Sequence, residues 1–311
     1  MLSFIIKETD SDQTLISFLK KRFRDTPLGL IYKLFRTKKV KVNEKDVRYY
    51  HHRLKKGEEI KIYDSNLKQS SQVSYSLSQP KTCLEVVYED NNILITLKEH
   101  GVTAPNLDNA VRYYLFQKNP SEYQKQVQDF FVLTAVHRLD KLTKGLVIYP
   151  KSPIVKRTLY KVISDKSKVT KKYLALCESS SKKHLPDYIS GYLEKNSQEQ
   201  RMVFSPSNSA PSAKYCALEI KEVDSEISHK IIKKHFSEYH NSVLFEITLH
   251  TGRKHQIRSI LSYFDKPVIG DKKYGSKIEI GNKIFLLAYK IMFDNLSSPL
   301  SYLNEKEFQI I

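Results

Sequence analysis

The chain has 311 residues, 40% of them hydrophobic, and its 52 lysines and arginines against 34 aspartates and glutamates give a net charge of +18. This length predicts about two domains, and the apolar content excludes a wholly disordered chain. The sequence shows no run of 18 apolar residues, no secretory signal and only three scattered cysteines. These features argue against a membrane span, secretion, a disulfide framework and a zinc cage, so we expect a cytoplasmic protein.

Residues 1–64 predict a small, basic module of helices and strands. A helix is expected after Asp12, which would cap its N-terminus, and a second helix after the turn at 25–27. Around Val40 the apolar positions alternate with lysines as in a strand, and residues 54–62 predict a turn and a closing strand. A basic surface of this kind suits RNA phosphates, although an ordinary solvated face has the same pattern.

Residues 65–82 are rich in serine and glutamine, a composition typical of a linker. Residues 83–311 predict a second domain in which strands and helices mix. Strands are expected at 84–88, 93–97, 145–149, 173–177, 215–222 and 243–250, and the first two would form a hairpin. A helix is expected at 254–264. We expect the polar stretch 178–213 to be irregular.

The motifs that are missing narrow the chemistry. The sequence contains no phosphate-binding loop, no dinucleotide fingerprint, no G-x-S-x-G elbow and no H-E-x-x-H pair. Nucleotide cofactors, metals and a serine nucleophile therefore become less probable. Positive charge favours a nucleic acid as the partner, but the excess of lysine over arginine is also typical of an AT-rich genome, and both interpretations remain open.

Two short segments hold three of the 11 arginines and two of the nine glycines of a chain that is poor in both. In residues 135–148, Asp140 lies on a loop before a buried-looking strand, where its carboxylate can act as a nucleophile or a general base. In residues 251–258, Arg258 follows His255 by three residues, so both can share one helix face. An arginine beside Asp140 would keep that carboxylate ionised. The alternative is a buried ion pair that braces a turn.

These segments resemble the motifs of one enzyme family. His137-Arg138-Leu139-Asp140 with Thr143 and Gly145 resembles the H-R-L-D-x-x-T-S-G motif of the RluA family of RNA pseudouridine synthases. The stretch from Gly252 to Arg258 and the stretch from Lys266 to Gly275 resemble that family's G-R-T-H-Q-I-R and P-I-x-G-D-x-x-Y-G. Further similarity covers the hairpin from Tyr88 to Gly101 and the strand Lys172-Tyr173-Leu174-Ala175-Leu176.

The resemblance implies an α+β fold. Residues 1–64 resemble a small S-four-like RNA-binding domain shared with a ribosomal small-subunit protein. With residues 65–82 as the linker, residues 83–311 would form the catalytic domain around a mixed, mainly antiparallel sheet. The segments at 31–36 and 40–43 are most similar to the RluC-type branch, which modifies large-subunit (23S) ribosomal RNA. The implied partner is ribosomal RNA or a ribosome precursor, bound by a monomer.

The resemblance also implies the reaction and its residues. The glycosidic bond of a flipped-out uridine is cut, and the uracil is rotated and rejoined through carbon 5, without cofactor or metal. Asp140 would act on the ribose or the uracil, Arg258 would pair with it, and Tyr173 would lie against the uracil. Arg138 would fill the space that the base leaves. Other expected RNA contacts, some of them also structural, are His137, His255, Arg253, Arg36, Lys39, Lys41 and Asn43.

Three positions depart from the family pattern: Lys144, the pair Glu99-His100 and Lys254. None removes a proposed catalytic group. Two other functions stay open at this stage. One is a non-catalytic RNA-binding or ribosome-assembly factor with the same fold, which binds RNA without modifying it. The other is a DNA-binding protein, against which the sequence offers no groove-reading motif.

Overall fold

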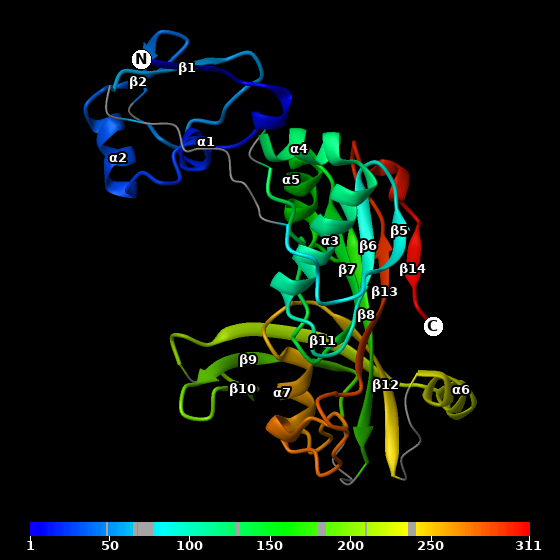
Figure 1. The fold of residues 1–311 in the computed structure, drawn as a ribbon. Coiled ribbons are helices and arrows are strands. Elements are labelled where there is room, and N and C mark those ends of the chain that lie inside the picture. Colours follow the sequence, from blue (N-terminus) through cyan, green and yellow to red (C-terminus); the bar gives the residue numbers. More distant parts are fainter. Residues whose placement is uncertain are drawn as a thin grey trace. The chain divides into compact units, whose positions relative to one another are not determined.

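The computed structural model describes residues 1–47, 49–64, 67, 77–128, 131–179, 185–208, 210–235 and 241–311 (Figure 1). The chain divides into two compact units. The first combines residues 1–77 with 115–132 and 152–154, and the second combines 78–114, 133–151 and 155–311. Most of the predicted linker, namely 65, 66 and 68–76, lies outside the described residues, so the division into 1–64, 65–82 and 83–311 stays a prediction.

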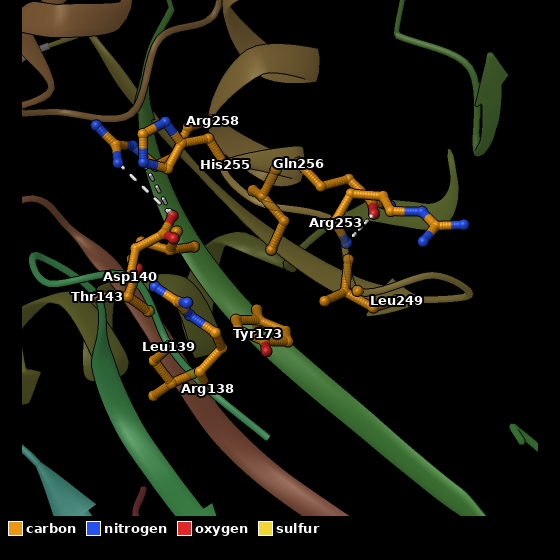
Figure 2. A pocket seen from close by; sticks show the side chains of 13 residues that line it. Arg138, Leu139, Asp140, Thr143, Tyr173, Leu249, Arg253, His255, Gln256 and Arg258 are labelled. Carbon is orange, nitrogen blue, oxygen red and sulfur yellow. Dashed lines mark hydrogen bonds and ion pairs between the residues drawn. The ribbon is translucent and has the colours of Figure 1, made fainter. Parts of the chain in front are cut away.

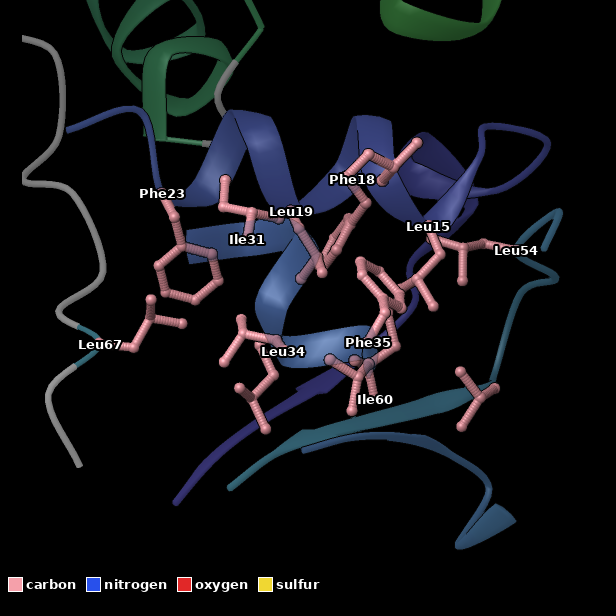
Figure 3. Close-up of a cluster of buried hydrophobic side chains, with 14 of the residues drawn as sticks. Leu15, Phe18, Leu19, Phe23, Ile31, Leu34, Phe35, Leu54, Ile60 and Leu67 are labelled. Carbon is pink, nitrogen blue, oxygen red and sulfur yellow. The ribbon is translucent and has the colours of Figure 1, made fainter. Parts of the chain in front are cut away.

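The first unit packs two helices on a small antiparallel sheet. Its strands follow the order β1-β4-β2-β3. The elements are β1 (Leu2–Ile5), the short helix η1 (Glu8–Asp10), α1 (Leu15–Arg22), α2 (Leu28–Arg36), β2 (Val40–Val42), β3 (Lys45–Asp46), β4 (Glu59–Ile62) and α4 (Pro120–Gln128). Leucine, isoleucine and phenylalanine side chains from α1 and α2 meet those of the sheet in one buried cluster (Figure 3). The predicted helices and strands of this module are confirmed.

The capping residue of α1 was predicted wrongly. Thr14, not Asp12, is the N-cap, and its hydroxyl accepts a hydrogen bond from the Ser17 amide at 3.3 Å. Asp12 has a left-handed backbone with φ of 55° and forms an ion pair with Arg53 at 2.8 Å. The helix begins at Leu15, so Asp12 precedes the capping position by two residues.

The second unit is built on one sheet of ten described strands. Nine follow the order β10-β9-β11-β12-β8-β13-β7-β6-β5, and β14 pairs with β13. The strands are β5 (Glu85–Glu89), β6 (Ile93–Lys98), β7 (Lys144–Pro150), β8 (Val169–Glu178), β9 (Tyr188–Asn196), β10 (Arg201–Ser205), β11 (Lys214–Glu222), β12 (Ser242–Leu249), β13 (Leu286–Phe293) and β14 (Glu307–Gln309). Every described pairing is antiparallel except that of β13 with β7, so the mixed, mainly antiparallel sheet is confirmed.

Helices pack on and beside this sheet. They are α3 (Ala104–Lys118, which crosses from the second unit into the first), α5 (Pro153–Val162), α6 (Ser225–His235), α7 (Gln256–Tyr263), η2 (Lys272–Tyr274) and η3 (Ser301–Leu303). Val155, Leu159 and Val162 of α5 lie in a core cluster with apolar side chains of β6, β7 and β13. Among the described residues, no helix has the length and apolarity needed to cross a membrane.

Gly145 permits the parallel contact between β7 and β13. Its φ is 142°, and a β-carbon at this position would come within 2.6 Å of the Ala288 amide nitrogen. The two strands therefore approach closely only because residue 145 is glycine. This approach places the end of the loop that carries Asp140 directly beside the sheet.

The expectation of an irregular stretch at 178–213 is wrong. β8 continues to Glu178, and β9 and β10 form an antiparallel hairpin at the edge of the sheet. In β9 the residues Ile189, Gly191 and Leu193 face inward while their neighbours face solvent. The strand therefore has few apolar residues, and its alternation includes a glycine that offers no apolar signal. Residues 180–184 and 209 lie outside the described part of this stretch.

Candidate active site

A pocket in the second unit brings the two motif segments together. Arg138, Asp140 and Thr143 line it from the loop before β7, Tyr173 from β8, and Arg253 and the residues from His255 to Arg258 from the turn into α7 (Figure 2). The loop is a tight turn, because the Thr143 amide donates to the Asp140 carbonyl at 3.1 Å. Leu139 and Ile257 are buried at the pocket's lining.

Lys98, at the end of β6, holds the loop from behind. Its ammonium group donates to the carbonyls of Glu99, Val102 and Lys141, each at 3.0 Å, and the residue is 1% exposed. Burial lowers the pKa of Lys98 to about 8, against the opposing charges of Asp140 and Glu99. Three carbonyl acceptors satisfy all three ammonium hydrogens, so this buried cation fixes the backbone directly after Asp140.

The Asp140 carboxylate faces two nitrogen atoms of α7 and its N-cap. Its Oδ2 lies 3.6 Å from Nη1 of Arg258 and 3.9 Å from Nε2 of His255 (Figure 2). Burial raises the pKa of Asp140, while Arg258, followed by Arg138 and Lys254, pulls it down. The net direction is upward, so Arg258 reduces the effect of burial on the carboxylate without cancelling it.

The strongest partner of Arg258 is a residue that sequence reasoning did not assign to the site. The guanidinium makes a two-pronged contact with Asp271, with Nε at 2.6 Å and Nη2 at 2.8 Å, and both side chains are buried. The Tyr274 ring lies 4.8 Å from the guanidinium carbon. Asp140, the partner expected from the resemblance, also faces Arg258 but at the longer distance of 3.6 Å. Asp271 and Tyr274 both belong to the motif from Lys266 to Gly275, so the sequence did indicate that this segment matters for the site.

The backbone conformation of His255 and the hydrogen bonds of Gln256 determine where α7 begins. The helix was expected from residue 254 and begins at Gln256, because His255 takes a left-handed conformation with φ of 53° as the N-cap. The buried Gln256 side chain accepts from the Arg253 amide at 3.0 Å and donates to the Ala217 carbonyl at 3.0 Å. Gln256 was quoted in the motif but had no predicted role.

Two aromatic and basic groups complete the pocket. Tyr173 is 6% exposed, and burial, helped by the charge of Asp140, raises the pKa of its hydroxyl above the ordinary range. Arg138 is exposed at the rim. Arg253 is exposed as well, and its Nε donates to the Tyr215 carbonyl at 3.1 Å. A neutral ring therefore lies inside the pocket and two guanidinium groups lie at its opening.

The sequence model of the family described as RNA pseudouridylate synthase matches residues 92–263. An uncharacterized RNA pseudouridine synthase of Mycoplasma capricolum is 38% identical over 314 residues, which cover 98% of this chain and 96% of the relative. The chain belongs to the RNA pseudouridylate synthase family. It is an isomerase that acts on RNA, of the RluA type expected from the motifs.

Less similar relatives also align over most of this chain and of their own length. The ribosomal large subunit pseudouridine synthase C of a Buchnera aphidicola strain is 28% identical over 88% of this chain and 80% of its own length. The Escherichia coli protein of the same name is 25% identical over 93% and 87%. Among solved structures, human RNA Pseudouridylate Synthase Domain Containing 1 superposes with a TM-score of 0.52 at 19% identity, covering 75% of this chain and 86% of that one. That likeness concerns the fold alone.

Other predicted contact residues of this pseudouridine synthase lie outside the pocket. His137 accepts a hydrogen bond from the Ile148 amide at 3.2 Å, and burial lowers its pKa to about 3, so it is a neutral brace of β7. In the first unit, Lys39 pairs with Asp64 at 2.8 Å and Asn43 accepts from the Glu59 amide at 2.9 Å. The other two, Lys41 and Arg36, belong to the same unit, where Arg36 is exposed at the end of α2 and the Lys41 ammonium lies 5.5 Å from the Tyr63 ring centre.

Two of the three departures from the family pattern lie next to each other, beside the loop that carries Asp140. Lys144 forms an ion pair with Glu99 at 2.7 Å, and Nδ1 of His100 donates to the Leu142 carbonyl at 2.7 Å. Glu99 and Lys144 thus compensate each other's charge. Lys254 adds positive charge near Asp140. Among the described residues, no group of three or more histidine, cysteine or acidic side chains is arranged to hold a metal ion.

Proposed function

We propose that this pseudouridine synthase modifies uridines of the 23S RNA of the large ribosomal subunit. The support comes from relatives named ribosomal large subunit pseudouridine synthase C, which align with 85–93% of the chain. A net charge of +18 suits a large, highly charged RNA. The alternative, a factor that binds RNA without modifying it, would have no use for a half-buried carboxylate that faces Arg258.

We propose further that Asp140 performs the reaction. The observation that carries this role is the position of its carboxylate, which lines the pocket and faces Arg258 at 3.6 Å. As nucleophile or base, the ionised Asp140 would help break the bond between C1′ of the ribose and N1 of uracil. The rotated uracil rejoins C1′ through C5, the C5 proton is lost to a base or to solvent, and N1 takes up a proton, so that no atom is gained or lost overall. Tyr173 is the aromatic surface against which the base would lie, and Arg138 at the rim would take the place of the flipped nucleotide.

The first unit would supply RNA affinity as an S-four-like domain. Its support is the pair of helices on a small sheet and the basic last turns of α1 and α2. Phosphate contacts of this kind position an RNA without reading its sequence. Lys39 and Asn43 already have protein partners, so Arg36 and other exposed cations of α2 are better candidates for direct contact.

The test is pseudouridine mapping on 23S RNA transcripts incubated with the wild type and with Asp140→Asn, with 16S RNA and transfer RNA as comparison substrates. We expect new pseudouridines at specific 23S positions with the wild type, and none with the variant while it still binds RNA. Modification confined to 16S RNA or transfer RNA would reject the proposed target. Tight binding without modification of transcripts or ribosome precursors would favour the binding factor, and a fully active Asp140→Asn would reject the role of Asp140.

A further inference from the structure

Two side chains, His255 and Tyr274, connect Asp140 to the edge strand β10. Nε2 of His255 lies 3.9 Å from Asp140 Oδ2, and Nδ1 of the same ring lies 2.9 Å from the Tyr274 hydroxyl. That hydroxyl accepts a hydrogen bond from the Met202 amide in β10 at 2.9 Å. The Ser259 hydroxyl of α7 donates to the Met202 carbonyl at 3.0 Å. Side chains around the pocket thus engage both backbone groups of Met202.

The partners of these two side chains determine which nitrogen of His255 carries the hydrogen. An amide can only donate, so the Tyr274 oxygen accepts from Met202 and its own hydrogen needs another acceptor. Tyr274 is 2% exposed, and an unpaired buried hydroxyl would cost about 1–3 kcal/mol. Among the described residues, Nδ1 of His255 is the acceptor within reach of that hydrogen. The hydrogen of the neutral ring is therefore on Nε2, the atom that faces the Asp140 carboxylate.

The ring stays neutral in this setting. Burial lowers the pKa of His255 to about 4, and the positive charges of Arg258, Lys254 and Lys273 act in the same direction. Asp271 opposes them, and Asp140 faces Nε2. At neutral pH the imidazole thus offers Asp140 an N–H dipole and carries no net charge.

We infer that His255 is a positioning residue that acts through Asp140, and that Tyr274, held by β10, selects its tautomer. The Nε2–H group and the Arg258 guanidinium face the same oxygen of the carboxylate, at 3.9 and 3.6 Å. Both distances exceed a hydrogen bond, so the two groups act electrostatically, favour the ionised carboxylate and fix its rotation. The inference rests on the proposed catalytic role of Asp140. Through the Met202 amide, the β9–β10 hairpin then helps to orient the Asp140 carboxylate.

The kinetic test compares the pH dependence of single-turnover rates for the wild type, His255→Asn and Tyr274→Phe. Asparagine tolerates the left-handed backbone at residue 255, and it is too short to reach Asp140. At saturating RNA we expect a rate lowered by about tenfold at neutral pH through lost orientation, and an acid limb moved to higher pH. Tyr274→Phe should move the limb the same way by a smaller amount. Tyr160→Phe, which removes an exposed hydroxyl on α5, should match the wild type.

A merely structural role would lower the rate equally at every pH and leave the acid limb in place, and that result would overturn the inference. Asp140→Asn, measured in parallel, separates the two proposals. If it keeps the wild-type rate, the proposed role of Asp140 fails. If it is inactive while the acid limb of His255→Asn does not move, only the present inference fails.

A second measurement does not depend on activity. Nitrogen-15 NMR of the histidine-labelled protein, with the His255→Asn spectrum assigning the signal, distinguishes the two tautomers. We expect hydrogen on Nε2 in the wild type and a mixture of tautomers in Tyr274→Phe. Hydrogen on Nδ1, or a doubly protonated ring at neutral pH, would overturn the inference even if a variant failed to fold.

Discussion

At the scale of single residues, the buried pair of Arg258 and Asp271 holds the guanidinium beside Asp140. Removing one partner of a buried ion pair costs about 3–5 kcal/mol, because the remaining charge is left without compensation. We therefore predict that Asp271→Asn lowers the free energy of unfolding by about that amount. It should also lower the catalytic rate, because Arg258 is no longer held in place. Urea unfolding and single-turnover assays measure the two effects.

Glu307→Gln is the matched control for this substitution. It removes the carboxylate of an ion pair with Lys290 at 3.2 Å in which the glutamate is about half exposed. Such surface pairs contribute about 0–1 kcal/mol, so stability and rate should stay close to the wild type. Equal losses in the two variants would show that the buried pair has no special role.

The pH dependence of the rate is also set by a single residue. Burial raises the pKa of Asp140 above the ordinary value of 3.8, with Arg258 opposing. With the proposed role of Asp140 the reaction needs the ionised carboxylate, so we predict a rate that is constant at neutral pH and falls as the pH decreases through this raised pKa. Single-turnover rates across the acid range, with circular dichroism to show that the fold persists, measure it. A rate that stays constant below pH 3.8 would contradict the prediction.

At the scale of elements, the contact between β7 and β13 depends on Gly145. In Gly145→Ala the new methyl group would meet Ala288 at less than contact distance, in a backbone with φ of 142°. Overpacking of this kind costs about 1–3 kcal/mol, so we predict a loss of stability in that range and a displaced Asp140 loop with a lower rate. Thermal unfolding and single-turnover assays test this.

Gly29→Ala provides the comparison for Gly145→Ala. Gly29 lies in α2, where a β-carbon would meet nothing within 4 Å and the backbone φ is negative. Alanine in a helix is about 0.5–1 kcal/mol more favourable than glycine, so this variant should be slightly more stable. The argument fails if Gly145→Ala is as stable as the wild type.

At the scale of the whole molecule, the sequence predicts elements whose apolar periodicity is strong and misses those without it. The hairpin of β5 and β6 and the strands β7, β8, β11 and β12 follow from short runs rich in apolar and β-branched residues. The edge hairpin of β9 and β10 does not, because β9 has few apolar residues and one of its inward positions is Gly191. Periodicity also cannot show that β13 pairs with β7, or that Asp271 folds back onto Arg258 thirteen residues earlier. Residue type and spacing indicated Asp140, His255 and Arg258, and the resemblance added Tyr173 and Arg138. The contacts among them follow only from the folded structure.

The net charge of +18 is a property of the whole molecule. Its contribution to RNA binding can be measured separately from catalysis. Lys33 and Arg36 are exposed in the last turn of α2. If they contact phosphates, Lys33→Ala with Arg36→Ala should weaken binding of a 23S RNA fragment and reduce the salt slope of log K by about 0.7 for each lost single-strand contact. The single-turnover rate at saturating RNA should not change, because Asp140 and its partners all lie in the other unit.

The control variant is Lys230→Ala, which removes an exposed lysine on α6 and tests whether the loss of any positive charge weakens RNA binding. An equal loss of affinity there would show that the charge acts as a diffuse field, and a lower saturated rate in the α2 variant would show that the first unit contributes to the chemical step.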